Sequence, residues 1–224
     1  MVRLELEYGI KISLGRVARL MKQMDLPKMS TVKPYRKNAS DEVLRTNVIK
    51  QDFSPSCPNS VWASDITYLK VNGKHAYLCV VMDLFSRKIV SWKLDFSMKA
   101  SIVCDALESA FLLRGKPNNL IFHSDQGSQY TGSELRNLLD KFNITASFSN
   151  KGYPYDNAVC ESFFKFLKKE CTNRRSYSTL DELRIDLFEY IEGFYNIRRP
   201  HSANNFLSPC EREDLYMKNL NSIP

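Results

Sequence analysis

The sequence has few of the residues that build zinc sites or disulfide frameworks. Its six cysteines are scattered without a C-x-x-C pair, and only three histidines are present. A structural zinc site is therefore not expected. We interpret the cysteines as reduced thiols that pack as small hydrophobic side chains.

Long apolar runs and repeats are also missing. No stretch of about 18 apolar residues is present to span a bilayer, and the N-terminus, MVRLELEYGI, lacks the basic-then-apolar order of a secretion signal. We therefore expect a cytoplasmic protein, associated with the nucleoid if its partner is DNA. The 224 residues, 43% hydrophobic and 25% charged, are typical of a soluble globular protein.

Acidic residues are too few to balance the basic ones. The formal net charge is +7, which favours a polyanionic partner. Residues 1–52 hold 11 Lys and Arg against 6 Asp and Glu, a charge of +5, so the other 172 residues carry only +2. This distribution suits a phosphate-contacting segment beside a domain that also houses acidic groups. Ordinary solvated surface charge on a basic protein is the alternative.

The order of predicted elements favours an α/β fold. Strands are predicted over residues 61–71, 75–85, 88–94, 119–125 and 144–150. Asn72-Gly73 between the first two is a hairpin signal, so they should pair antiparallel. Helices are predicted over residues 98–115 and 133–143, and further helices follow the fifth strand. We predict a mixed five-stranded sheet flanked by helices.

Three regions are expected along the chain. Residues 1–52 form a basic region with a short amphipathic helix over 13–26 and a polar linker. Residues 53–212 form the main domain, and residues 213–224 form a tail. Thr179 and Glu182 make a capping box that begins a long C-terminal helix.

Two aspartates occupy unusual places on predicted strands. Asp65 lies inside the first strand, and Asp125 ends the fourth in the segment IFHSDQGSQYTG. Taken alone, each is more often a solvated or capping residue than a catalyst. His123 and Ser124 do not form a nucleophile and base, because adjacent strand residues point to opposite faces, and we interpret His123 as structural. Gly127 and the polar turn would leave room for a ligand backbone to approach.

A third carboxylate lies on a predicted helix that begins near Asp156, a good N-cap residue. At about 100° per residue, Glu161 shares a polar face with Asn157, Lys165 and Lys168, whereas the opposite face is aromatic and aliphatic. We expect the apolar face of this helix to pack on the sheet and the opposite face to expose Glu161, Lys165 and Lys168. An exposed i,i+4 Glu-to-Lys pair is the alternative, and from this helix alone it is favoured.

The motifs taken together resemble a known family. Asp65 and Asp125 are separated by 59 residues, and Asp125 and Glu161 by 35. With VWASDITYL, DLFSRKIVSW, HSDQGSQY, DNAVCESFFKFLKKE and YNIRRPHSA in this order, residues from about 47 to about 212 resemble the integrase core of OrfB-type insertion-sequence transposases, which carry a D,D(35)E triad. Two mild departures from the family pattern are Tyr155 and Cys160.

The resemblance implies a ribonuclease H-like fold and a metal-dependent DNA transposase that cleaves element ends and transfers the 3′-hydroxyl strand. Asp65, Asp125 and Glu161 would be the catalytic, metal-binding triad, holding two Mg²⁺ or Mn²⁺ ions. Asn157, Lys165, Lys168, Arg198 and Arg199 would contact DNA, the two lysines through phosphates. NKGYPYDN, residues 150–157, resembles a mobile loop beside such a site, and a plain surface loop is the alternative.

Partners and rival functions also follow from the resemblance. DNA, as element ends and target, is the expected partner, and a homo-oligomer is expected because two ends must meet. The helix over 13–26 resembles the last helix of a helix-turn-helix without its partners, so the chain is expected to act with an upstream helix-turn-helix protein or as a fusion with one. The rivals are an inactive or regulatory DNA-binding remnant and a structure-specific nuclease of the same fold.

Overall fold

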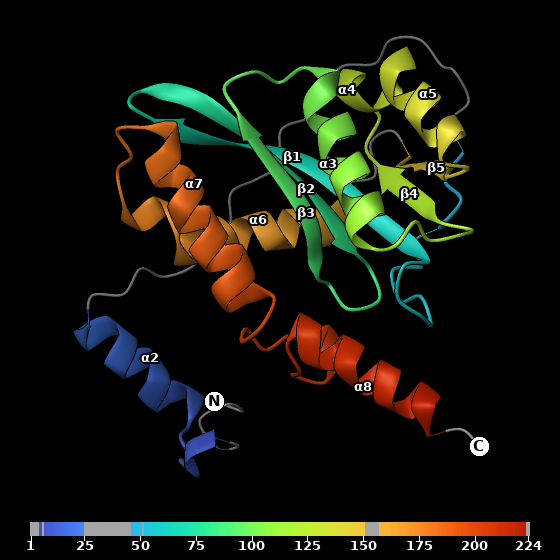
Figure 1. Ribbon diagram of the computed structural model, residues 1–224. Coiled ribbons are helices and arrows are strands. Elements are labelled where there is room, and N and C mark those ends of the chain that lie inside the picture. The colour runs from blue at the N-terminus through green and yellow to red at the C-terminus, as the bar shows by residue number, and fades with distance from the viewer. Residues whose placement is uncertain (1–4, 6, 25–45, 51, 151–156, 223–224) are drawn as a thin grey trace.

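The architecture is seen in a computed structural model, which describes residues 5, 7–24, 46–50, 52–150 and 157–222 (Figure 1). One five-stranded sheet forms its centre, in the order β3-β2-β1-β4-β5. β1–β2 and β2–β3 pair antiparallel, whereas β1–β4 and β4–β5 pair parallel, so the predicted mixed sheet is confirmed. The strands are β1 Val61–Val71, β2 Lys74–Asp83, β3 Ile89–Asp95, β4 Ile121–Ser124 and β5 Thr145–Phe148.

The Asn72-Gly73 turn sets the register of the first hairpin. Both residues have positive φ, 46° and 74°, which is the conformation of the two-residue turns that join twisted antiparallel strands. Val71 lies opposite Lys74, and the ladder continues to Trp62 opposite Asp83. Residues of β1 therefore alternate strictly between the two faces of the sheet.

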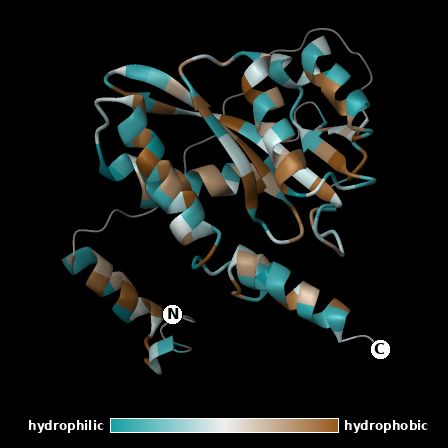
Figure 2. Cartoon of the chain, viewed as in Figure 1, coloured by the Kyte–Doolittle hydropathy of each residue, from teal (hydrophilic) through white to brown (hydrophobic). Residues whose placement is uncertain are grey.

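Helices cover both faces of the sheet (Figure 1). One face packs against α3 (Ala100–Leu113) and α5 (Ser133–Lys141), and the other against α6 (Ala158–Glu170) and α7 (Leu180–Phe188). Figure 2 shows the hydrophobic residues concentrated along the strands and the helix sides that face them. The helices predicted over 98–115 and 133–143 are confirmed. A short helix, α4 (Ser128–Thr131), lies where the sequence indicated only a turn.

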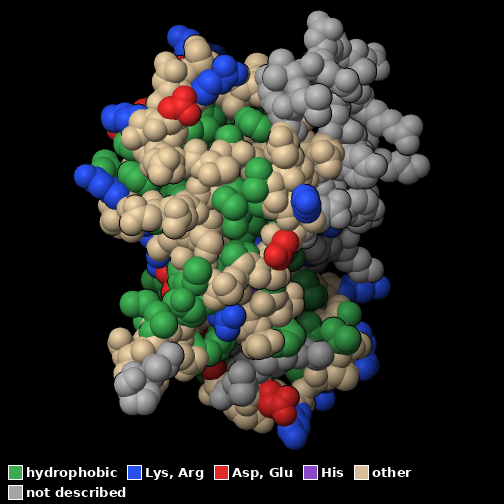
Figure 3. All heavy atoms as spheres, turned by 90° about the vertical axis from the view of Figure 1, so that its right-hand side faces the viewer, with side chains coloured by type: hydrophobic (Ala, Val, Ile, Leu, Met, Phe, Trp, Pro, Cys, Tyr) green, Lys and Arg blue, Asp and Glu red, His purple; other side chains and the backbone are tan. Residues whose placement is uncertain are grey.

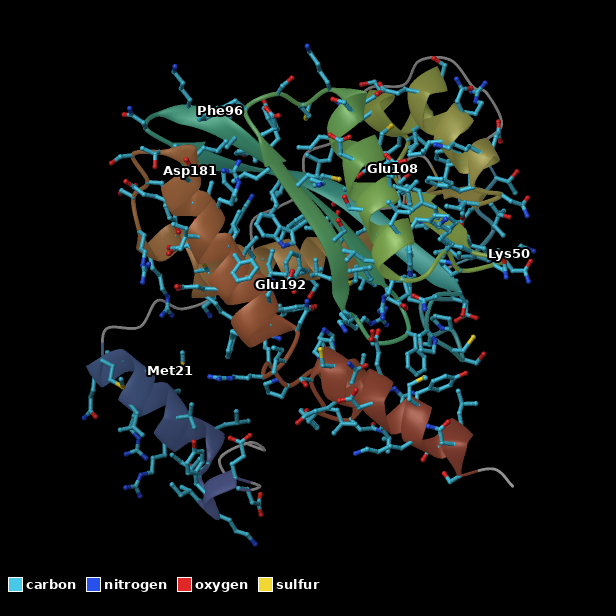
Figure 4. The ribbon with its side chains drawn as sticks, in the orientation of Figure 1. Met21, Lys50, Phe96, Glu108, Asp181 and Glu192 are labelled. Carbon is cyan, nitrogen blue, oxygen red and sulfur yellow. The ribbon has the colours of Figure 1, made fainter. Side chains whose placement is uncertain are left out.

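The predicted capping box at Thr179 differs in one bond. The Thr179 hydroxyl accepts a hydrogen bond from the Glu182 N–H at 3.2 Å, as expected. The Glu182 carboxylate accepts from the N–H of Ser178, one residue earlier than a standard capping box requires. After Phe188 the helix widens to a π-helix, Glu189–Tyr195, whose Glu192 accepts hydrogen bonds from Trp92 Nε1 and Asn196 Nδ2, each at 3.1 Å (Figure 4).

The remaining elements are short or peripheral. They are α2 Leu14–Gln23, the 3-10 turns Thr172–Arg174 and Ser202–Asn204, and α8 Pro209–Asn221. α2 confirms the predicted N-terminal amphipathic helix, and none of its residues is buried. α8 crosses the boundary that the sequence placed at residue 212. None of the helices described is long and apolar enough to cross a membrane.

A buried ion-pair cluster attaches α8 to the sheet. Glu213 is 8% exposed, and its carboxylate pairs with Arg114 at the end of α3 and with Lys88 Nζ at 3.2 Å. The Ser86 hydroxyl donates to the same carboxylate at 2.8 Å. Burial acts to raise the pKa of Glu213, but Arg114, Lys88 and Ser86 outweigh it and lower that pKa.

Replacing Glu213 with Gln leaves the Arg114 guanidinium without its main partner. We expect the free energy of unfolding at pH 7 to fall by about 3 kcal/mol, the usual effect of breaking one side of a buried ion pair. Because the folded pKa of Glu213 is lowered, its contribution is complete above the unfolded pKa of about 4.3 and is lost as pH falls through the folded value. Urea denaturation of wild type and Glu213→Gln at pH 7 and at pH 3 measures both effects.

The matched control is Asp214→Asn, since Asp214 is the exposed neighbour on the same helix. It should change the free energy of unfolding by no more than about 0.5 kcal/mol. Equal effects of the two substitutions at pH 7 would show that the cluster does not hold α8.

Candidate active site

Asp65 occupies the middle of the central strand. On β1, Val61, Ala63, Leu69 and Val71 face the layer of α6 and α7, and Asp65 shares their face because strand residues alternate. It lies opposite Val80 of β2. Asp65 Oδ1 accepts a hydrogen bond from the Ile66 N–H at 2.8 Å. The hydrophobic strand therefore places one half-buried carboxylate beneath α6.

Asp125 is brought beside Asp65 by the parallel pairing of β1 and β4. Ala63 lies opposite His123, and Asp65 and Asp125 each follow two residues later, so they leave the sheet on the same face. Asp125 Oδ1 accepts a hydrogen bond from the Gly127 N–H at 2.8 Å. The end of β4 thus aims a second carboxylate toward the first.

Glu161 comes from the helix above these two residues. Cys160, Phe163, Phe164 and Leu167 are buried against the sheet, which fixes the rotation of α6 and leaves Glu161 exposed on its front. Asp156, the predicted N-cap, lies outside the described residues, and α6 begins at Ala158 after Asn157. The predicted buried side of this helix and the exposure of Glu161 and Lys165 are confirmed, whereas Asn157, predicted on the same polar face, precedes the helix and is buried.

The electrostatics identify Asp65 as the centre of the cluster. Burial is the main cause that raises the pKa of Asp65 to about 7, and the negative charge of Asp125 adds to it. Glu161 raises it further, whereas the Ile66 hydrogen bond and the charge of Lys168 act to lower it. Burial also raises the pKa of Glu161. Asp125 and Glu161 are therefore near enough to act on the charge of Asp65.

The donor set matches a hard divalent cation, although the side chains have not converged on one point. Within the described part of the chain, no three His, Cys, Asp or Glu residues are placed so that they could hold a metal ion as they stand. Oxygen donors of the Asp and Glu type are those that Mg²⁺ and Mn²⁺ prefer. A cation is also the partner that three mutually repelling carboxylates need, because it removes the repulsion that raises the pKa of Asp65.

The two predicted lysines lie differently on α6. Lys165 is exposed, whereas Lys168 is half-buried, and burial lowers the pKa of Lys168 while the charge of Asp65 acts to raise it. The Lys168 ammonium lies 4.8 Å from the centroid of the Tyr68 ring. Lys168 is thus next to the carboxylate cluster, and Lys165 faces solvent.

Asn157 and Arg199 have internal partners. Asn157 is 6% exposed, and its side-chain amide donates to the Ser64 carbonyl oxygen at 3.4 Å. Arg199 Nη2 donates to Glu170 Oε1 at 2.9 Å, and its guanidinium stacks 3.9 Å from the Phe166 ring centroid. The DNA contacts expected of these two residues remain predictions, and both side chains tie α6 to its neighbours. Arg198 is exposed.

Several residues that sequence reasoning did not select support the site. The Tyr130 hydroxyl, fully buried behind β1, hydrogen-bonds the Ser64 hydroxyl at 2.9 Å. The His123 ring bonds the Ser147 hydroxyl at 2.9 Å and the Ser149 hydroxyl at 3.2 Å, so both ring nitrogens are engaged, as a structural histidine requires. Tyr130 is the one aromatic residue of the polar segment QGSQYTG, and this isolation was the sequence signal that it could be buried. The segment 151–156 of the predicted loop lies outside the described residues.

Comparison with known sequences identifies the chain's relatives. Residues 55–154 and residues 142–209 match two families, each described as Integrase core domain. The transposase for insertion sequence element IS904 of Lactococcus lactis is 40% identical over 209 residues, which are 92% of this chain and 82% of the relative. Transposase InsF for insertion sequence IS3A of Escherichia coli is 42% identical over 168 residues, 75% of this chain and 58% of InsF.

Solved structures agree on the fold. A chain of the simian T-cell lymphotropic virus intasome superimposes with a TM-score of 0.60 at 19% identity, over 80% of this chain and 61% of that one. The HTLV-2 integrase catalytic core domain in complex with magnesium gives a TM-score of 0.54 at 19% identity, over 70% and 98%. The sequence matches and the shared fold show that the chain belongs to the insertion-sequence transposases, enzymes built on a retroviral-integrase-like core domain.

Proposed function

We propose that the chain carries out the DNA-transferring step of transposition through Asp65, Asp125 and Glu161. The reaction is cleavage at an element end by water, followed by attack of the freed 3′-hydroxyl on target DNA. The observation that carries the proposal is the placement of Asp65 and Asp125 on one face of the sheet by the β1–β4 register, with α6 and its Glu161 packed over that face; burial and the neighbouring charges raise the pKa of Asp65 accordingly. A sheet interior holds such a cluster stably only when a proton or a cation neutralises it.

Mg²⁺ or Mn²⁺, as two ions, is the proposed cofactor of this cluster. Bound there, divalent ions would supply Lewis-acid stabilisation of the reacting phosphodiester. The chain's own contribution is to hold three oxygen donors on rigid elements. Asp65 is oriented by the Ile66 N–H and Asp125 by the Gly127 N–H, and α6 holds Glu161 through its buried aromatic side.

Phosphate binding is assigned to the basic residues beside the cluster. Lys168, close enough to lower the pKa of Asp65, would hold a phosphate next to the carboxylates. Lys165 and Arg198, both exposed, would contact the DNA backbone farther away without reading bases. We further propose a homo-oligomer that brings two ends together, and cooperation with an upstream helix-turn-helix protein for recognition of element ends.

The first test is strand transfer with end-sequence DNA and Mg²⁺ or Mn²⁺. Glu161→Gln, which keeps the shape of the side chain and removes its charge, should lower cleavage and joining by at least about 100-fold. The matched control is Glu134→Gln, on the exposed side of α5, which should retain activity. Full joining by Glu161→Gln would refute the triad. Cleavage of branched DNA without joining would indicate a nuclease.

The second test uses folding stability without metal. Because the folded pKa of Asp65 is raised to about 7, the protonated carboxyl contributes stability that is complete below the unfolded pKa of about 3.9 and is lost as pH rises through about 7. In EDTA, Asp65→Asn should therefore unfold like wild type at pH 4 and be more stable at pH 8.5, by up to about 4 kcal/mol.

Urea denaturation at the two pH values measures this difference, with Asp140→Asn, at an exposed residue of α5, as the matched control. Adding Mg²⁺ at pH 8.5 should stabilise wild type and leave Asp65→Asn unchanged. A stability difference that does not vary with pH would show that folding does not raise the pKa of Asp65.

The third test concerns the position of Asp125. A Cβ added to Gly127 would lie 2.9 Å from Asp125 Oδ1 and 3.2 Å from Gln129 Oε1, whereas φ at this residue, −58°, suits any amino acid. Gly127→Ala should therefore displace the carboxylate without straining the backbone. We expect joining to fall by about 10- to 100-fold while the free energy of unfolding changes by less than about 1 kcal/mol.

Gly132→Ala is the matched control, because its added Cβ would make only an ordinary contact, 3.6 Å from the Ser128 carbonyl oxygen. Joining rates and urea denaturation of both variants separate the two effects. Equal activity of Gly127→Ala and Gly132→Ala would exclude a positioning role for Gly127.

A further inference from the structure

Among the described residues, the end of the first hairpin leaves exposed one edge of β1, next to Asp65, and the sheet face opposite the carboxylates. Within the part of the chain that the structure describes, β4 pairs with β1 at Val61, Trp62 and Ala63, and the rest of β1, which includes Asp65, pairs only with β2. Tyr68 is 56% exposed, and Lys70 and His75 are exposed too. In Figure 1 the hairpin extends past α3 toward α7.

Aromatic and cationic side chains share this uncovered face. Tyr68 lies opposite Tyr77, and Lys70 lies opposite His75, so the four project from one side of the hairpin. The Tyr68 and His75 rings are 4.9 Å apart between centroids, tilted by 40°. Asp95, opposite Tyr77 on β3, is the acidic neighbour on this face, and its Oδ1 accepts a hydrogen bond from the Ser97 N–H at 2.9 Å.

Tyr68 and Asp65 lie on opposite faces of β1, because strand residues alternate. Lys168 of α6, on the face of Asp65, reaches around the open edge of the strand to Tyr68. Its ammonium lies 4.8 Å from the centroid of the Tyr68 ring, and its charge acts on Asp65. A cation over an aromatic ring is attracted by the ring's electrons, so the Tyr68 ring and the ammonium hold each other in place. Along the open edge, Lys168 therefore lies between Asp65 and the Tyr68 ring. A DNA strand whose reacting phosphate lay at Asp65 could place its next phosphate at Lys168 and a base on Tyr68.

The side of α5 and β5 has one described pair of this kind, Lys141 Nζ at 5.1 Å from the centroid of the Phe142 ring, but that ring is half-buried. Figure 3 views the side of α5 and β5, where the described charged side chains are scattered among apolar and neutral ones. Exposed aromatic rings interleaved with lysines are the features by which proteins hold unpaired nucleotides, because every base has a stackable face and every phosphate a charge. Paired bases inside a duplex do not offer those faces.

We propose that Tyr68, Lys70, His75 and Lys168, the Tyr68 platform, bind unpaired nucleotides of the DNA strand next to the reacting phosphate. The Tyr68 ring stacks on a base, and Lys168 and Lys70 hold the flanking phosphates. This inference rests on the proposed function for one point only, that the reacting phosphate lies at Asp65, Asp125 and Glu161. It adds to that function a binding site for the unpaired nucleotides of a DNA end whose base pairs have separated.

The experiment measures binding in EDTA, where no chemistry occurs. Fluorescence anisotropy with a labelled oligothymidylate of about 20 nucleotides and with a labelled duplex of equal length gives affinities for wild type, Tyr68→Leu, Tyr68→Phe and Phe188→Leu. Phe188 on α7 is 59% exposed and is the matched control for loss of an exposed ring. Tyr68→Leu should bind the single strand about five- to tenfold more weakly and the duplex within about twofold of wild type, while Tyr68→Phe and Phe188→Leu bind both like wild type.

A second readout reports stacking directly. With 2-aminopurine placed in the oligothymidylate, wild type and Tyr68→Trp should quench its fluorescence on binding, whereas Tyr68→Leu should not. Tyr68→Trp retains a large ring, so it also serves if Tyr68→Leu fails to fold in thermal denaturation. Three results would overturn the platform. The first is equal single-strand affinity of Tyr68→Leu and Phe188→Leu, and the second is an equal loss of duplex affinity in Tyr68→Leu. The third is a loss of single-strand affinity in Tyr68→Phe or Tyr68→Trp.

The two proposals fail separately. If the triad assignment is wrong, Glu161→Gln will still join DNA, while Tyr68→Leu will still weaken single-strand binding in EDTA. Loss of the platform would appear as unchanged single-strand binding by Tyr68→Leu, while joining still requires Glu161.

Discussion

Burial of the Asp65 carboxyl beside two other carboxylates, at the middle of β1, is the constraint on which the rest of this structure depends. That burial, with smaller contributions from the charges of Asp125 and Glu161, raises the pKa of Asp65 to about 7. The remainder of the fold supplies what is needed to keep that unfavourable arrangement in place: a continuous hydrophobic strand on either side of Asp65, a parallel neighbour that ends at Asp125, and a helix clamped by its aromatic back.

The clamp on α6 extends well beyond the site. Its last turn is held by Glu170, which accepts from Arg199 and from the Tyr190 hydroxyl at 2.7 Å. Its beginning is joined to β1 through Asn157 and the Ser64 carbonyl. Asn157 and Arg199, which the family resemblance assigns to DNA contacts, therefore stabilise the position of α6. This matters because α6 carries Glu161 close to the negative charge of Asp65. In this fold α6 places Glu161, and other residues, Asn157 and Arg199 among them, hold α6.

Particular elements show how far sequence reasoning reaches. It predicts Val61–Val71 with both bounds correct, since the alternation of its residues and the Asn-Gly turn are local signals. It misses α8, although Ser208, Pro209 and Glu211 form a capping box with Pro at the first turn. That helix is weakly amphipathic, and its attachment depends on Glu213 meeting Arg114 across 99 residues. The change to a π-helix after Phe188 likewise has no local signal.

The sequence by itself determined the five strands and most of the helices in order, because backbone periodicity and turn chemistry act over a few residues. Its family resemblance proposed Asp65, Asp125 and Glu161 as the triad. Tertiary structure alone decided which side chains meet. Burial of Asp65 beside Asp125 follows from the register of β1 and β4, and the approach of Lys168 to Tyr68 follows from the early end of β4. Burial and Coulomb forces depend on distance in space, and distance in space is set by packing between segments far apart in the chain.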